Sequence, residues 1–118
     1  MTPETTRRNW DAYSKAWTDI SSAEREVLMR EVLADHVTYT SPDSDGRGRD
    51  GLAAVIADFQ RQYPGAYFET DLLLEQHNQS LADWTMRDRA GAALLKGRSY
   101  VRYGEQGLME HLAGFWPR

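Results

Sequence analysis

The stretch AYFETDLLLEQHNQSLADWTMRDRAGAALLKGRSYVRYGEQGLMEHLAGFW, residues 66–116, predicts an antiparallel meander of four strands. Apolar and charged residues alternate along it, which gives each strand one apolar and one charged face. The breaks between the strands contain the Gly, Asn, Asp and Ser that hairpin loops favour. The positions on the predicted apolar faces are Phe68, Leu72 and Leu74, then Ala82, Trp84 and Met86, then Leu95, Ser99 and Val101.

Three helices and one short strand are predicted before the meander. A threonine, a proline and an acid at residues 2–4 have the composition of a helix start, and this helix is expected to run to about Asp19. A serine and a glutamate with the spacing of a capping box open a second helix at Ser21. The β-branched run at residues 36–40 predicts a short strand. A polar loop at residues 43–50 and a third helix, ended by a Pro-Gly pair, follow it.

This order of elements predicts an α+β fold. Helices that precede a meander, rather than alternating with its strands, are expected to lie on one face of the sheet. We therefore expect a cone-shaped α+β barrel, in which three N-terminal helices pack on a strongly bent antiparallel sheet and leave room for a cavity. A length of 118 residues fits one domain, spanning residues 1–118.

The composition and charge of the chain argue against some classes of binding partner. A net charge of −4 and a pI near 5.3 argue against nucleic acid, because phosphate binding requires clustered Lys and Arg. No apolar run approaches a membrane span, and the amino-terminal residues lack the pattern of a secretion signal. The absence of cysteine excludes disulfides and thiolate sites. We expect a cytoplasmic protein that binds neither nucleic acid nor membrane.

Three motifs are weighed and set aside. Residues 46–51 match G-x-G-x-x-G, but no βαβ unit surrounds them, so a flexible loop before a helix is the preferred interpretation. Asp43 and Asp45 are not followed by the remaining ligands of a calcium loop. The three histidines, His36, His77 and His111, are too scattered for a zinc spacing. We predict no metal and no cofactor.

The chain resembles the nuclear transport factor two-like superfamily, and within it the SnoaL-like polyketide cyclases and ketosteroid isomerases. The resemblance covers nearly the whole sequence and rests on the order of several short motifs. They are Trp10, Tyr13 and Trp17, then VTYTSP at 37–42, GLAA at 51–54, YPGAYF at 63–68, His77, Trp84, GRS at 97–99, Gly107 and the pair at 114–115.

The resemblance implies a largely apolar pocket between the helices and the sheet, and a homodimer formed through the outer sheet face. Ketosteroid isomerases use an Asp base and an oxyanion hole of Tyr and protonated Asp. At the positions that the family gives to the two acids this chain has Ser41 and Ser99. A serine hydroxyl donates a hydrogen bond but is no carboxylate base, so the usual steroid isomerisation is not expected.

The resulting hypothesis is a cofactor-free enzyme that rearranges an apolar carbonyl compound by cyclisation, isomerisation or related proton transfer. Tyr13, Tyr39 and Ser99 would polarise the carbonyl. His77 would carry the proton, although its strand parity requires a β-bulge to turn it inward. The predicted substrate-binding residues are Trp17, Ser41, Phe59, Trp84, Met86, Val101 and Phe115. Two alternatives stay open, a non-catalytic binder of a hydrophobic molecule and a dimeric interaction module.

Overall fold

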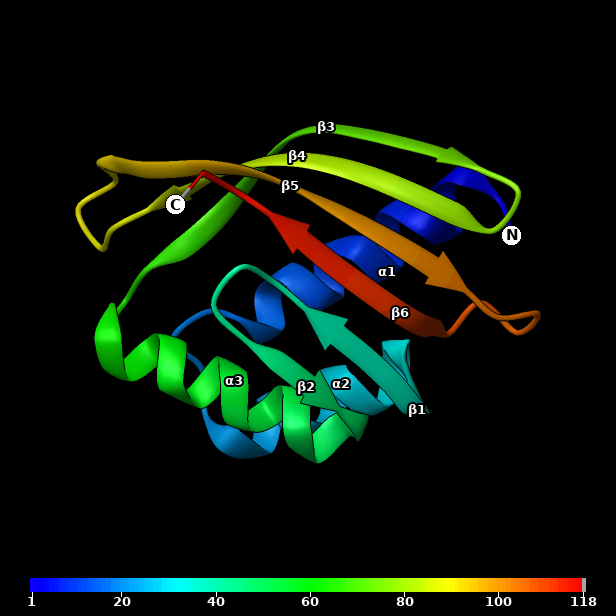
Figure 1. The fold of residues 1–118 in the computed structure, drawn as a ribbon, viewed down its shortest axis with the longest axis horizontal. Helices are drawn as coiled ribbons and strands as arrows, with labels where there is room; N and C mark the ends of the chain where they lie inside the picture. Colours follow the sequence, from blue (N-terminus) through cyan, green and yellow to red (C-terminus); the bar gives the residue numbers. More distant parts are fainter. Residues whose placement is uncertain (118) are drawn as a thin grey trace.

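A computed structural model describes residues 1–117 of the chain. Three helices cover one side of a curved six-stranded sheet, and helix α1 crosses beneath the strands of the meander (Figure 1). The elements are α1 (Pro3–Ala16), α2 (Ser22–Val32), β1 (Leu33–Thr40), β2 (Asp45–Arg47), α3 (Gly48–Gln62), β3 (Tyr67–Gln76), β4 (Gln79–Arg87), β5 (Ala93–Tyr103) and β6 (Met109–Phe115). The predicted α+β architecture is confirmed.

Side chains near its two ends hold helix α1 in place. The Thr2 hydroxyl accepts a hydrogen bond from the Thr5 backbone N–H at 3.1 Å and caps α1. The α1 helix ends at Ala16, earlier than the expected Asp19. Arg25 of α2 binds this end, since its guanidinium donates to the backbone carbonyls of residues 16, 18 and 20 at 2.8, 3.0 and 3.3 Å. One arginine thus binds the last carbonyl of the helix and two carbonyls of the segment that follows it.

The sheet is mixed and open, which corrects the predicted antiparallel barrel. Its strand order is β2-β1-β6-β5-β4-β3, so β2 and β3 form free edges. The meander of β3 to β6 was predicted, but β1 pairs with β6 in parallel, with Thr38 opposite His111. The polar loop predicted at residues 43–50 contains β2, which pairs with the end of β1. A three-residue strand carries too few side chains to show an alternation.

A β-bulge in β3 changes which residues face the helices. The register with β4 shifts between Thr70 and Leu72, so the residues after the shift turn to the opposite face. Phe68 lies on the inner face, as predicted, but Leu72 and Leu74 are 47% and 54% exposed on the outer face. The prediction that these three residues share one apolar face was therefore wrong, because strict alternation assumes an unbroken register.

The core lies between the helices and the inner face of the sheet. Leu33, Leu52, Ile56, Val101 and Met109 are fully buried in one continuous cluster. Within residues 1–117, no helix is long and apolar enough to cross a membrane. A site for apolar molecules can therefore form in this buried layer between the helices and the sheet.

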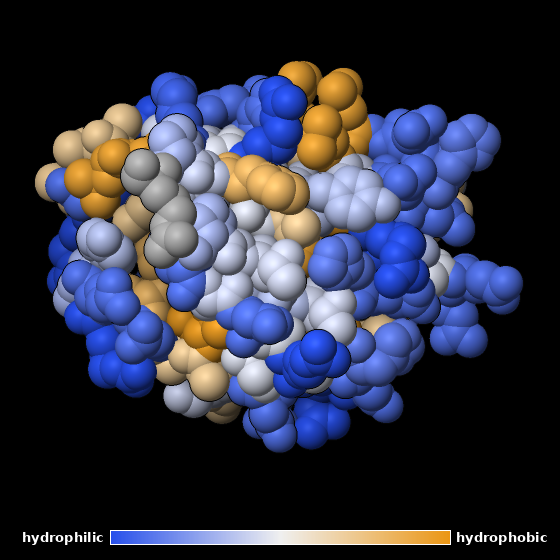
Figure 2. All heavy atoms as spheres, viewed as in Figure 1, coloured by the Kyte–Doolittle hydropathy of each residue, from blue (hydrophilic) through white to orange (hydrophobic). Residues whose placement is uncertain are grey.

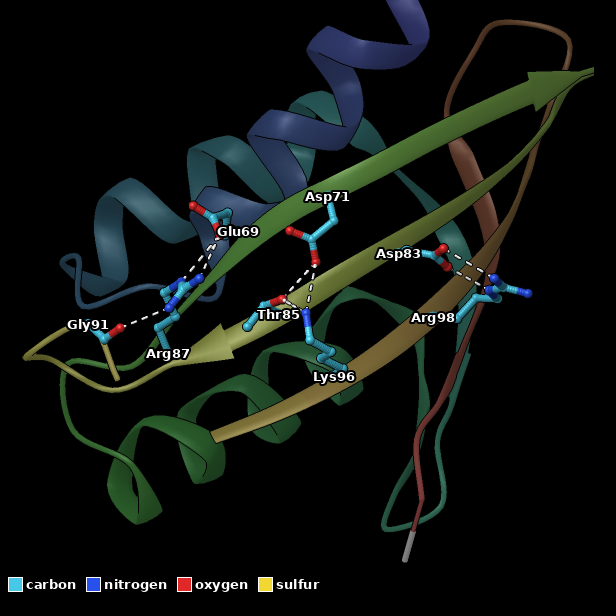
Figure 3. A network of polar contacts seen from close by, with 8 residues as sticks. All are labelled: Glu69, Asp71, Asp83, Thr85, Arg87, Gly91, Lys96 and Arg98. Atoms are coloured by element: carbon cyan, nitrogen blue, oxygen red, sulfur yellow. Dashed lines mark hydrogen bonds and ion pairs between the residues drawn. The ribbon is translucent and has the colours of Figure 1, made fainter. Parts of the chain in front are cut away.

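The outer face of the sheet carries a ladder of ion pairs (Figure 3). Arg98 donates to Asp83 through two nitrogens at 2.6 and 3.1 Å, and Arg87 pairs with Glu69 at 3.0 Å. The salt bridge between Arg98 and Asp83 lowers the pKa of that carboxyl. The face of the molecule drawn in Figure 2 is largely hydrophilic, with a separate apolar group at its upper edge, where β3 runs.

Candidate functional site

A cavity of about 740 Å³ lies between α1, α3, the loop after β1 and the inner face of β4 and β5. Eight of the eleven predicted site residues contribute to its wall, and their chemical roles stay predictions. These eight are Tyr13, Trp17, Tyr39, Ser41, Phe59, Trp84, Met86 and Ser99. Trp10, which was not among the predicted site residues, also lies on the wall.

Aromatic rings form most of the apolar wall. The Trp17 ring centroid lies 5.7 Å from that of Tyr39, 5.5 Å from Phe59 and 5.9 Å from Phe68. The Phe68 ring in turn packs edge to face against Trp84 at 5.0 Å. These distances are those of favourable ring pairs, so the rings support one another and form a fixed surface suited to a flat apolar molecule.

Two buried phenols supply hydrogen-bond donors. Burial raises the pKa of Tyr13 well above its ordinary value, and the neighbouring Tyr39 raises it further. Burial also raises the pKa of Tyr39 to about 12, although the nearby hydroxyls of Ser41 and Ser44 lower it. Both phenols therefore stay protonated at neutral pH and can donate to a ligand oxygen.

Ser99 is held by a tryptophan on the neighbouring strand. The Trp84 indole N–H donates to the Ser99 hydroxyl at 2.9 Å. The Trp84 ring lies directly against Gly97, which pairs with it across the strands, so that any larger residue would collide with the ring. The Ser99 oxygen accepts this bond, which leaves its own O–H free to donate into the cavity.

Ser41 organises the loop that presents a carboxylate. Its hydroxyl accepts hydrogen bonds from the backbone N–H groups of Asp43 and Ser44 at 3.3 and 3.1 Å, and its own N–H donates to the Ser44 carbonyl at 2.9 Å. Asp43 follows on the cavity wall, where it accepts from the Trp116 indole at 3.3 Å and contributes to raising the pKa of Tyr39. A structural turn thus occupies the position where the family resemblance implied a base.

Asp43, Asp45 and Asp58 contribute to the cavity wall and were missed as site residues in the sequence. Asp43 and Asp45 were considered only as calcium ligands. The Ser-Pro-Asp-Ser run is typical of a turn closed by serine hydroxyls, and that signal predicts that Asp43 is held close to the end of β1.

Three predicted residues lie elsewhere. His77 occupies an exposed turn between β3 and β4, with φ of 43°, at the opposite end of the hairpin from the cavity. The bulge in β3 comes earlier in the strand and does not turn it inward. Val101 is fully buried in the closed part of the core, and Phe115 is 60% exposed on the outer face. His111 also faces outward and shares a 2.7 Å hydrogen bond with Thr38.

No three His, Asp or Glu side chains gather closely enough to hold a metal ion in the part of the chain from residue 1 to 117. The polar side chains of the cavity wall are instead phenols, serine hydroxyls, the Gln62 amide, the carboxylates of Asp43 and Asp45 in and beside the loop after β1, and that of Asp58 on α3. This set can bind and orient a carbonyl oxygen and can accept a proton.

A family model described as a SnoaL-like domain matches residues 14–111. The chain belongs to the SnoaL-like family. The predicted resemblance to SnoaL-like proteins is thereby confirmed. No protein of curated function is detectably similar to this SnoaL-like domain.

Solved structures share the fold of this SnoaL-like domain. A proposed isomerase of the SnoaL-like family from Agrobacterium tumefaciens has a TM-score of 0.90 at 22% identity, with 98% of this chain and 99% of that chain covered. A proposed polyketide cyclase from Sinorhizobium meliloti has a TM-score of 0.73 at 11% identity, with 91% and 93% covered. A proposed ketosteroid isomerase from Kribbella flavida has a TM-score of 0.72 at 21% identity, with 98% and 79% covered. Identities this low show a common fold alone.

Proposed function

We propose that this SnoaL-like domain binds an apolar carbonyl compound in the cavity and rearranges it by proton transfer, as in an isomerisation or cyclisation. The observation that carries the proposal is a cavity of about 740 Å³ with aromatic walls and two protonated phenols, Tyr13 and Tyr39. Aromatic walls favour a flat apolar body, and phenols that stay protonated favour an oxygen acceptor.

The proposed step begins with removal of a proton from the carbon next to the carbonyl. The C–H electrons form a C=C bond, the carbonyl electrons move to oxygen, and the oxygen accepts hydrogen bonds from Tyr13, Tyr39 or Ser99. Asp43 is the proton acceptor, because it lies on the cavity wall beside Tyr39, whereas His77 lies in a distant turn. The protonated Asp43 then returns the proton to another atom of the same molecule, so no co-reactant is consumed.

The second candidate is a binding protein without chemistry. Serines stand at both positions to which the resemblance assigns acids, and Ser41 is engaged in its own loop. The third candidate, an interaction module, requires a cavity packed shut and is disfavoured by the open volume.

The test uses 1-tetralone, a bicyclic ketone with exchangeable protons beside its carbonyl. Tryptophan fluorescence is followed during titration to measure binding, and loss of the α-proton signal in D₂O is then followed by NMR. The proposal predicts saturable binding and exchange faster than in buffer alone. Asp43→Asn should retain binding and lose exchange by about 100-fold or more, since a positioned base contributes this much.

His77→Asn is the matched control, because asparagine tolerates the left-handed backbone of this turn and the residue lies away from the cavity. It should exchange as fast as the parent protein. Binding without exchange above buffer would support the second candidate. Full exchange activity in Asp43→Asn would remove that carboxylate from the mechanism.

We also infer that the partner of the outer sheet face is a second copy of the chain. Leu72, Leu74 and Phe115 are exposed on this face, and its acids and bases are already paired within one copy. A face with internally neutralised charges can meet an identical face without like-charge repulsion. Light scattering after gel filtration should show a dimer that Leu74→Glu weakens and that Val27→Glu, on exposed α2, leaves intact. A parent monomer at all concentrations would refute the dimer.

A further inference from the structure

Trp116 follows the end of β6, and its side chain returns to the cavity as part of the wall. Its half-buried ring packs edge to face against Trp84, with the two ring centroids 5.8 Å apart. A Cβ at Gly114 would lie only 2.9 Å from the Trp116 ring, so the ring lies close against the backbone of β6. The sheet therefore fixes the position of this indole, through contacts with β6 and with Trp84 of β4.

The same indole reaches the loop after β1. Its N–H donates to the Asp43 carboxylate at 3.3 Å. Asp43 is an exposed residue, and an exposed side chain has several rotamers of similar energy. The Ser41 hydroxyl accepts from the backbone N–H of Asp43 at 3.3 Å, which holds the main chain of the loop. The bond from Trp116 holds the side chain.

A carboxylate held in this way can still take up a proton. The indole uses one lone pair of the Asp43 Oδ2 atom, and the two oxygens of a carboxylate have about four lone-pair sites. Trp116 also packs against Trp84, whose own N–H donates to the Ser99 hydroxyl at 2.9 Å. One pair of tryptophans thus connects the proposed base with one of the proposed oxygen donors. A reaction that needs both groups at fixed places depends on this connection.

We infer that Trp116 is a positioning residue, whose indole N–H holds the Asp43 carboxylate where it can take the α-proton of a bound ketone. This inference rests on the proposed function and adds to it the residue that orients the base. Displacing a catalytic group by about 1 Å can slow a reaction by about 100-fold. Loss of the bond should therefore slow proton transfer more than it weakens binding.

The first experiment compares Trp116→Phe with the parent protein, using 1-tetralone in D₂O. Phenylalanine keeps a ring against Trp84 and removes the N–H donor. The inference predicts that proton exchange at saturating 1-tetralone falls by about tenfold or more. The dissociation constant from fluorescence titration should stay within about threefold of the parent value, because an aromatic ring still lines the wall. A residue that only shaped the wall would change the affinity and leave the saturated rate as it is.

The second experiment uses proteins that keep Trp116. In the ¹H–¹⁵N spectrum without ligand, the Trp116 indole resonance, assigned through its own backbone, should move upfield in Asp43→Asn, because a hydrogen bond to a charged oxygen is stronger than one to an amide. Asp58→Asn is the matched control, since Asp58 also lies on the wall but accepts from Arg61 and Gln62 instead. It should leave the indole resonance in place.

An indole resonance that is the same in Asp43→Asn as in the parent would overturn the inference. A saturated exchange rate in Trp116→Phe equal to that of the parent would do so as well. In both cases slow exchange by Asp43→Asn would leave the proposed function standing. A parent protein that binds 1-tetralone without exchanging its protons would overturn the proposed function, and this inference with it.

Discussion

Raising the pH from 9 to 11 is expected to weaken the fold through Tyr39. The side chain is 5% exposed, and burial raises its pKa from 10.0 to about 12. Between these values the unfolded chain has lost the phenolic proton and the folded chain has kept it. The unfolded state therefore binds fewer protons, and the free energy of unfolding falls as the pH rises.

The magnitude follows from the two pKa values. At pH 11 the ratio of ionised to protonated Tyr39 is about 10 to 1 in the unfolded chain and about 1 to 10 in the folded chain. This difference lowers the free energy of unfolding by about 1.4 kcal/mol. The assay is urea unfolding followed by far-ultraviolet circular dichroism at pH 7, 9 and 11, for the parent protein and Tyr39→Phe. Circular dichroism is used because tyrosinate quenches tryptophan emission.

Between pH 7 and 9 the stability difference between the two proteins should be constant, since both states keep the proton. By pH 11 it should move by about 1.4 kcal/mol in favour of the phenylalanine variant. A difference that stays constant through pH 11 would refute the conclusion that the Tyr39 hydroxyl is held protonated in the cavity wall.

Two further predictions concern stability. Gly97→Ala should lower the free energy of unfolding by about 1 to 3 kcal/mol, because the added methyl overlaps the Trp84 ring. Urea unfolding measures this loss. An unchanged unfolding midpoint would show that the ring moves freely. Arg25→Ala should lower the free energy of unfolding by about 2 to 4 kcal/mol, because it removes three hydrogen bonds to the carbonyls of residues 16, 18 and 20. Arg25→Lys should recover little of this loss, since lysine lacks the planar fork. Full recovery by lysine would mean that charge alone is sufficient.

The elements with local signals were predictable from the sequence. Each hairpin of the meander has its turn residues between two alternating runs. Trp10, Tyr13 and Trp17 have the spacing of one helix face, and all three are buried. Elements whose pairing depends on residues far away in the sequence were not predictable. The parallel pairing of β1 with β6 joins Thr38 to His111, and nothing in either short run indicates the direction of pairing.

Site residues were predictable where burial decides their position. They were not predictable where a turn or a bulge in the backbone decides it. Aromatic residues on the inner faces reached the cavity wall, as at Trp17 and Trp84. The position of His77 depended on positive φ at two turn residues, and the outward turn of Leu72 depended on one extra residue in β3. A bulge leaves almost no trace in an alternating pattern, because the run on either side of it still reads as a strand.

The sheet order also governs how the molecule can form as it is made. Strand β1 lies between β2 and β6, and its partner β6 is synthesised about seventy residues later. At the usual pace of translation this delay lasts several seconds or more. During that time the early strands have only each other and the helices as partners, while the meander forms through short-range hairpins. Strand β6, which is made after the other five strands of this sheet, is therefore the one that joins the two halves of the sheet.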